Sequence, residues 1–343
     1  MNAIKPLRIW LERSVSPTLS EILHSDYFEL TDGPEHADVI IYERDDPDYV
    51  SQTPEFQKWS HKCVIIGEHD RPSYFLPGCY ASNQRGLLSK GRIQTMSYIV
   101  SQRTVPNPFI KDITDVEPRR YLYSFKGGST SWARKKLFKL GLKGDDILVE
   151  EANQYLHWNY EESYETKKQA LQKEYADTLQ QSYFFLCPRG AGVSSIRLFE
   201  VMQAGRVPVI IADEWVPIEG LPWDEFSITI RESSLAEMDS IIRAKKDVAV
   251  VFGKKAREVW LQYCAPGAEG FMLAKSLRSV QANRNEAREK LIRSVFPLLR
   301  LKDTIKGKGF AFAKRLVLLA YTLMGKKFPY SLNRPEEEQS KKK

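Results

Sequence analysis

The stretch YFFLCPRGAGVSSIRLFEVMQAGRVPVII (residues 183–211) decides the fold of this chain. Its first five residues are all apolar, which predicts a short buried strand, and residues 188–192 form a turn that contains Pro and Gly. Residues 194–204 have the apolar spacing of a helix, Gly205 ends that helix, and residues 207–211 begin the next strand. The stretch therefore predicts a compact βαβ unit.

The same alternation of short apolar runs and polar breaks continues before this unit. It predicts further strands at residues 7–11, 38–42, 63–67 and 121–125, and helices at residues 16–24, 132–140 and 160–177. We interpret the last of these helices, which is rich in Glu and Lys, as a solvated helix with no role in chemistry. Alternating strands and helices predict the α/β class with parallel sheets.

A Pro-containing segment at residues 105–118 predicts a linker between two α/β lobes. We expect an N-terminal lobe at residues 1–110, a second lobe at residues 111–300 and a basic C-terminal segment at residues 301–343. With 343 residues the chain can bury an ample core without disulfides. Its four cysteines are far apart and form no CxxC pair, which argues against a zinc site and against a disulfide framework.

The net charge of +7 is located at one end of the chain. Residues 301–343 contain 11 basic and four acidic residues, so residues 1–300 are formally neutral and do not favour a nucleic-acid-binding face. Residues 1–10 lack the apolar core of a secretory signal, and no segment has the ~20 apolar residues of a membrane span, so we expect a cytoplasmic protein. The mixed apolar and basic residues 309–327 favour two alternatives equally, a helix on an anionic membrane surface and a helix packed back across the lobes.

Candidate binding residues follow from the spacing within residues 183–211. Ser194, Arg197 and Glu200 lie at i, i+3 and i+6 of the predicted helix and so share one face. A Gly-containing turn before a helix N-terminus suits a phosphate, and a neighbouring cation and carboxylate can hold a diphosphate and a ribose diol. Spacing alone favours the alternative, an Arg197–Glu200 pair on a solvated helix face.

Residues 185–190 and 195–211 resemble the signature of the exostosin-like glycosyltransferases. This resemblance implies a GT-B fold, with two Rossmann-like lobes whose parallel sheets face a central cleft. It also implies transfer of a sugar from a nucleotide-sugar donor to a growing glycan, with the signature in the donor lobe. Residues 124–127, followed by Arg134, resemble the family's Phe-Lys-Gly segment and downstream basic residue near the donor phosphates.

Two further segments resemble parts of the family more loosely. Residues 212–226 resemble the continuation toward a Leu-Pro and Trp-containing segment, whose aromatic side chains we expect to pack rather than to bind ligand. Glu68, His69 and Asp70 resemble an acceptor-lobe His-Asp motif of some plant members.

From the resemblance we expect inverting transfer from a UDP-sugar to a glycan or lipid-linked acceptor, with no cofactor and no bound metal. It implies a set of donor-binding residues: Lys126, Arg134, Arg189, Gly190, Ser194, Ser195, Arg197 and Glu200. An inverting step needs a base for the acceptor hydroxyl, for which Asp70 is the first candidate, followed by Glu68 and His69. Asp70 equally fits a turn-forming role before Arg71 and Pro72.

Two other functions remain open at this point. One is a non-catalytic glycan-binding or scaffold protein that keeps both lobes but has lost turnover. The other is a GT-B enzyme of the fucosyltransferase type that uses a GDP-sugar. Retention of Arg189, Arg197 and Glu200 argues against the first, because a decayed donor site is free to lose them.

Overall fold

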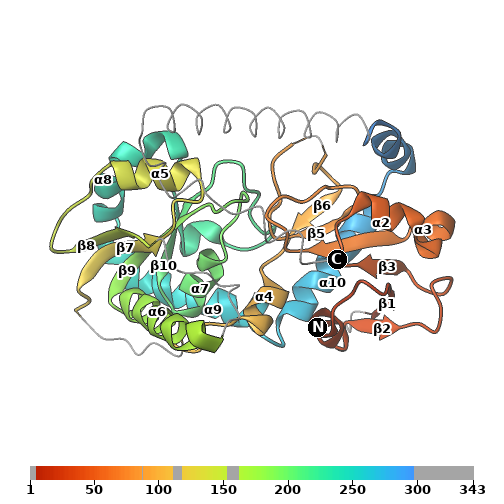
Figure 1. Ribbon diagram of the computed structural model, residues 1–343, viewed down its shortest axis with the longest axis horizontal. Helices are drawn as coiled ribbons and strands as arrows, with labels where there is room; N and C mark the ends of the chain where they lie inside the picture. The colour runs from red at the N-terminus through yellow and green to blue at the C-terminus, as the bar shows by residue number, and fades with distance from the viewer. Residues whose placement is uncertain (1–4, 87, 111–117, 153–161, 297–343) are drawn as a thin grey trace. The chain divides into compact units, whose positions relative to one another are not determined.

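The computed structural model describes residues 5–86, 88–110, 118–152 and 162–296 (Figure 1). Residues 1–284 form one compact unit that contains two β-sheets. Residues 285–343 form a second unit, of which residues 286–296 are helical.

The first sheet has six strands in the order β2-β1-β3-β4-β5-β6, and every neighbouring pair is parallel (Figure 1). The strands are β1 (Leu7–Leu11), β2 (Phe28–Leu30), β3 (Val39–Tyr42), β4 (Cys63–Gly67), β5 (Gly78–Tyr80) and β6 (Ile93–Thr95). The early helices are α1 (Pro17–Leu23), α2 (Pro47–Gln52), α3 (Pro54–Trp59) and α4 (Ile99–Thr104). Every residue of β3 and β4 is buried, which explains why these strands are continuous apolar runs without alternation.

The second sheet has five parallel strands in the order β11-β10-β9-β7-β8. They are β7 (Tyr121–Gly127), β8 (Ile147–Glu151), β9 (Ser182–Pro188), β10 (Val207–Ile211) and β11 (Ile228–Thr229). The α-helices here are α5 (Trp132–Lys139), α6 (Glu162–Gln180), α7 (Arg197–Gln203), α8 (Met238–Arg243) and α9 (Ala249–Tyr263). The 3₁₀ helices are η1 (Trp223–Glu225), η2 (Glu232–Glu237) and η3 (Lys246–Val248). Two parallel sheets with helices confirm the predicted fold class.

The βαβ unit predicted from residues 183–211 is confirmed. Strands β9 and β10 pair in parallel, with Phe184 opposite Val207. Gly205 ends α7 with φ of +63°, a conformation that glycine adopts without a steric penalty. The amide of Arg206 then donates to the carbonyl of Val201, which closes the helix end.

The start of α7 differs from the prediction. The helix begins at Arg197 rather than at Ser194, because residues 193–195 belong to the preceding turn. The Ser194 carbonyl accepts a hydrogen bond from the amide of Gly190, and the Ser195 carbonyl accepts one from Leu198. The predicted three-residue helix face therefore reduces to Arg197 and Glu200.

One helix from late in the chain packs on the first sheet. In α10 (Glu269–Ala282), Leu273, Ala274, Leu277 and Val280 are buried in the same core as β1, β3 and β4. The chain thus crosses back to its first sheet within the described residues. The segment predicted to do so, residues 309–327, lies outside them, and the predicted lobe boundaries stay predictions.

Loops at the ends of the two sheets contact each other within residues 1–284. The Trp215 indole donates to the carbonyl of Ala81 at 3.2 Å, and the amide of Val216 donates to Asn83 at 2.9 Å. Trp215 also packs edge-on against Trp223, with ring centroids 5.5 Å apart. Both tryptophans therefore pack, as the sequence predicted.

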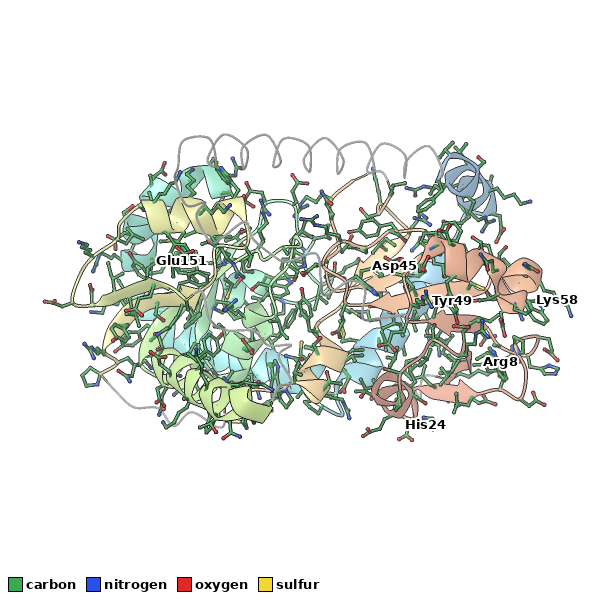
Figure 2. All side chains as sticks on the ribbon, in the orientation of Figure 1. Arg8, His24, Asp45, Tyr49, Lys58 and Glu151 are labelled. Carbon is green, nitrogen blue, oxygen red and sulfur yellow. The ribbon has the colours of Figure 1, made fainter. Side chains whose placement is uncertain are left out.

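Polar side chains lie at the surface and the cysteine thiols lie in the interior. His24 and Lys58, labelled in Figure 2, are exposed, whereas all four cysteine thiols are buried. None of the helices in the described ranges is both long and apolar enough to cross a membrane.

Candidate functional site

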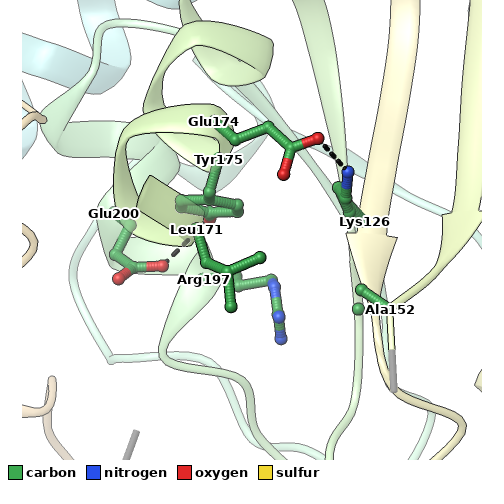
Figure 3. A pocket seen from close by; sticks show the side chains of 8 residues that line it. Lys126, Ala152, Leu171, Glu174, Tyr175, Arg197 and Glu200 are labelled. Carbon is green, nitrogen blue, oxygen red and sulfur yellow. Dashed lines mark hydrogen bonds and ion pairs between the residues drawn. The ribbon is translucent and has the colours of Figure 1, made fainter. Parts of the chain in front are cut away.

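A pocket lies where β7, α6 and α7 meet (Figure 3). Its walls are formed by Lys126, Gly127, Ala152, Leu171, Glu174, Tyr175, Arg197 and Glu200. The pocket brings together three residues that the sequence placed in a donor site, namely Lys126, Arg197 and Glu200. They come from the carboxyl end of β7 and from one face of α7, so the βαβ unit itself positions the site.

Arg197 has a guanidinium with unused hydrogen-bonding capacity. Its Cζ lies 5.6 Å from the ring centroid of Phe125 and 5.8 Å from that of Tyr175. Among the described residues, its buried Nε has no acceptor and Arg197 forms no ion pair. A Cβ at position 127 would lie 3.0 Å from Nη2, so Gly127 allows the close approach. A partly buried guanidinium with no ion-pair partner in the described part of the chain suits an anionic ligand.

Glu200 is buried beside Arg197, and its Oε2 accepts a hydrogen bond of 2.9 Å from the Tyr175 hydroxyl. Burial raises the pKa of this carboxyl, while the charge of Arg197 and the hydrogen bond from Tyr175 act in the opposite direction. No ion pair joins Arg197 to Glu200 in the described part of the chain, and the face is not solvated. The alternative of a solvated Arg–Glu pair is therefore wrong.

Lys126 differs from Arg197 because its charge is already compensated. Its Nζ lies 2.5 Å from Glu174 Oε1 and 3.3 Å from Glu150 Oε2. Burial alone would lower the pKa of Lys126, but the two carboxylates raise it. An anionic ligand that binds this lysine has to compete with Glu174.

Arg134 supports the turn rather than the pocket. It is buried, and its guanidinium donates to the backbone carbonyls of Gly128, Pro188 and Arg189 at 3.1 to 3.3 Å. Burial, together with the positive charge of Arg197, lowers its pKa to about 9. These bonds tie the loop after β7 to the turn after β9.

The remaining predicted donor residues lie in the turn after β9. The side chain of Arg189 pairs with Glu232 at 2.7 Å, and the amide of Gly190 donates to Ser194 at 3.0 Å. The Ser195 hydroxyl is buried and has no hydrogen-bond partner in the described ranges. None of these residues lines the pocket of Figure 3.

The three candidate bases have different surroundings. Glu68 caps α4, because its carboxylate accepts from the amides of Val100 at 2.7 Å and Ser101 at 2.9 Å and from the Ser101 hydroxyl. Burial raises its pKa to about 7 despite these bonds. His69 and Asp70 follow it in an exposed loop. This arrangement gives Glu68 a structural task and leaves Asp70 accessible.

The structure brings Asp70 next to the turn after β9. A Cβ on Gly192 would overlap the backbone carbonyl of Asp70 and would lie 2.7 Å from the Ser82 hydroxyl, so only glycine fits at this contact. The negative charge of Asp70 also acts on Arg134, where it favours the charged guanidinium. Among the described residues, the Asp70 carboxylate accepts no hydrogen bond and forms no ion pair.

The sequence interpretation of α6 is wrong on the inner face of this helix. Tyr175, Ala176 and Leu179 pack on the core of the second sheet, Leu171 lines the pocket at the same helical spacing, and Tyr175 reaches Glu200. The apolar spacing was present in the sequence, but the many Glu and Lys residues of the outer face obscured it. In the described residues, no group of three His, Cys, Asp or Glu side chains is arranged to hold a metal ion.

Comparisons with known proteins support the resemblance. The sequence model of the exostosin GT47 domain matches residues 13–245, a range that includes the pocket. Exostosin-1 of Drosophila melanogaster is 32% identical over 136 residues, which cover 37% of this chain and 18% of the relative. A probable glucuronosyltransferase of Oryza sativa subsp. japonica is 41% identical over 70 residues, 20% of this chain and 16% of the relative.

These alignments cover less than a fifth of the length of either relative. Among solved structures, a glycosyltransferase from Rickettsia africae is 10% identical, with a TM-score of 0.37, and the match covers 81% of this chain and 98% of that chain.

Proposed function

The chain belongs to the exostosin GT47 family of glycosyltransferases, and from this premise we propose that it transfers a sugar from a nucleotide-sugar donor to a glycan or lipid-linked acceptor. The observation that carries the proposal is one pocket that holds both the buried carboxylate of Glu200 and the guanidinium of Arg197, which forms no ion pair among the described residues. A nucleoside diphosphate presents the complementary groups, a charged diphosphate and a ribose diol, a short distance apart.

In the proposed complex, Arg197 contacts the diphosphate and Glu200 accepts hydrogen bonds from the ribose hydroxyls. Two vicinal hydroxyls match the two oxygens of a carboxylate. Lys126 adds a second cation once Glu174 has moved away from it. We propose a UDP-sugar as the donor because of the family resemblance, and a GDP-sugar is the alternative.

The proposed transfer step is a single inverting displacement. The acceptor hydroxyl loses its proton to Asp70 and its oxygen attacks the anomeric carbon, while the bond from that carbon to the diphosphate oxygen breaks. The electron pair of this bond leaves with the diphosphate, whose growing negative charge Arg197 and Lys126 stabilise. The mechanism assigns this task to the two side chains rather than to a metal ion. Asp70 is the proposed base because it is accessible and lies beside the Gly192 turn.

The cellular location and the role of residues 309–327 remain proposals. We propose a cytoplasmic enzyme whose basic segment binds an anionic membrane surface and so reaches a lipid-linked acceptor. Sedimentation with anionic liposomes, with and without residues 305–343, tests this; equal sedimentation of both forms contradicts it.

The test of the proposed function is a thermal-shift titration with UDP-, GDP-, CMP- and dTDP-sugars, each with and without Mn²⁺. A ligand that binds the native state raises the melting temperature, so a shift confined to one nucleotide class identifies the donor. A parent protein that responds to none of the four contradicts the proposal.

Turnover is measured in parallel as the release of nucleoside diphosphate in the presence of candidate acceptors. Asp70→Asn should lower turnover on the order of a hundredfold and leave donor binding unchanged, because a general base acts only in the chemical step. Equal turnover by this variant and the parent excludes Asp70 as the base. Donor binding without turnover by the parent, over a broad acceptor panel, supports the non-catalytic alternative.

A further inference from the structure

Tyr175 of α6 contacts Arg197 and Glu200, the two charged side chains that α7 contributes to the pocket (Figure 3). Its hydroxyl donates to Oε2 of Glu200 at 2.9 Å, and among the described residues no other group donates to this carboxylate. The guanidinium of Arg197 lies over its ring, with Cζ 5.8 Å from the ring centroid. One side chain therefore holds the carboxylate through its hydroxyl and supports the cation through its ring.

The position of Tyr175 is fixed by packing from the sheet. Its ring meets Phe185 of β9 edge-on, with centroids 5.4 Å apart and an interplanar angle of 80°. Phe185 is completely buried. The ring of Tyr175 therefore rests on a rigid strand in the centre of the second sheet.

Arg206 connects the C-terminal ends of α6 and α7, the two helices that form walls of the pocket. Its buried guanidinium donates to the carbonyls of Leu179 and Gln180 at the end of α6, at 3.3 and 3.0 Å. It also donates to the carbonyls of Ala204 and Gly205 at the end of α7, at 3.2 and 3.1 Å. These bonds join the backbone of the helix that carries Tyr175 to the backbone of the helix that carries Arg197 and Glu200.

We propose that Tyr175 is a positioning residue of the donor site, whose hydroxyl aims the Glu200 carboxylate at the donor ribose while its ring supports Arg197. This inference rests on the proposed function and adds a residue that lies outside the signature stretch. Tyr175 acts through Glu200 and Arg197 rather than on the reacting atoms.

The hydroxyl of Tyr175 also affects the pH dependence of donor binding. The groups that face Glu200 are Arg197 on its own helix, Tyr175 on α6 and the Cys187 thiol on β9. Burial raises the pKa of the thiol far above its usual value, so Cys187 stays neutral. The hydrogen bond from Tyr175 favours the ionised carboxylate, so its loss raises the pKa of Glu200 further. Without the hydroxyl, Glu200 becomes protonated at a higher pH, and donor affinity falls off at a higher pH.

The test compares Tyr175→Phe with Tyr123→Phe in the full chain. Both substitutions remove one hydroxyl and keep the ring, and the Tyr123 hydroxyl also donates to a carboxylate, Asp239, at 3.0 Å. The probe is the nucleoside diphosphate of the class that binds the parent, titrated by calorimetry from pH 5 to 8. A melting curve without ligand first confirms that each variant is folded.

We expect Tyr175→Phe to weaken binding about tenfold, the effect of one hydrogen bond to a charged group, and to move the acid limb of the affinity profile to higher pH. Tyr123→Phe should leave the affinity and its pH profile unchanged. In a Glu200→Gln background, Tyr175→Phe should cost much less than in the parent, because the neutral amide oxygen is a weaker acceptor than the carboxylate and no longer titrates.

Three outcomes are distinguishable. A parent that binds no nucleotide contradicts the proposed function and this inference with it. A parent that binds, with Tyr175→Phe binding equally well and with the same pH profile, overturns the inference alone. An equal loss from Tyr175→Phe with and without Glu200 also overturns it, because the effect is then independent of the carboxylate.

Discussion

Glu68, which follows β4, is partly buried and Glu200 on α7 is buried, and burial raises the pKa of each carboxyl. Their partners differ. Glu68 accepts hydrogen bonds from two amides and one hydroxyl at the start of α4, which uses its capacity inside the protein. Among the described residues Glu200 accepts one bond, from Tyr175, and its side chain lines the pocket. A raised pKa alone therefore does not identify a binding residue, whereas unused hydrogen-bonding capacity does.

Three arginines beside the second sheet, Arg134, Arg189 and Arg197, also differ in whether their hydrogen-bonding capacity is already used. Arg134 donates to three backbone carbonyls and Arg189 pairs with Glu232, so both guanidinium groups stabilise the turn after β9. Arg197 lies over two aromatic rings, and its Nε has no acceptor in the ranges that the structure describes. Of the three, Arg197 has the capacity to bind an incoming anion.

The largest difference in ligand affinity is expected between Glu200→Gln and Glu68→Gln. Glu200→Gln should weaken binding of the nucleoside diphosphate on the order of a hundredfold, because an amide offers the ribose diol one acceptor oxygen and no charge. Glu68→Gln should leave this affinity unchanged, because its carboxylate bonds to α4 and not to the ligand. Calorimetric titration measures both constants.

An equal loss of affinity in the two glutamine variants would contradict the claim that Glu200 binds the ligand and Glu68 does not. It would mean that both substitutions weaken ligand binding by lowering the general stability of the protein. The melting temperature of each variant without ligand controls for that effect.

A smaller effect is expected from Glu174→Gln, which frees Lys126. Glu174 is half exposed, so its ion pair with Lys126 is weak, and removal of the competing charge should tighten donor binding by about two- to fivefold. Asp177→Asn is the matched control on the same helix, because it breaks the Lys173–Asp177 pair outside the pocket. Weaker binding by Glu174→Gln would show that Glu174 itself contacts the donor.

The central elements of the fold were predictable because their patterns are local. Strands β1 and β4 match their predicted ranges, and the βαβ unit at residues 183–211 has the predicted order. Strands β2, β5 and β6 were missed because three residues are too few to show a periodicity. β5 begins with Gly78 at φ of +155°, where a Cβ would collide with the backbone of Ile65, so pairing rather than propensity defines it.

The site was predictable only where its residues are close together in the sequence. Arg197 and Glu200 lie on one turn of a helix, so their proximity follows from the sequence. The partners of Arg134, Arg189 and Glu68 come from other elements, and nothing in the local spacing reveals them. Tyr175 was missed because the charged outer face of α6 dominates the composition of that helix.

The central claim is that the pocket beside α7 binds the donor through Arg197, and its most direct test compares Arg197→Ala with Arg243→Ala. Arg243 is a matched cation in the same α/β unit that pairs with Asp146 and Asp239 outside the pocket. Calorimetric titration with the nucleoside diphosphate should show a loss on the order of a hundredfold or more for Arg197→Ala and parental affinity for Arg243→Ala. Parental affinity in a folded Arg197→Ala protein would contradict the account.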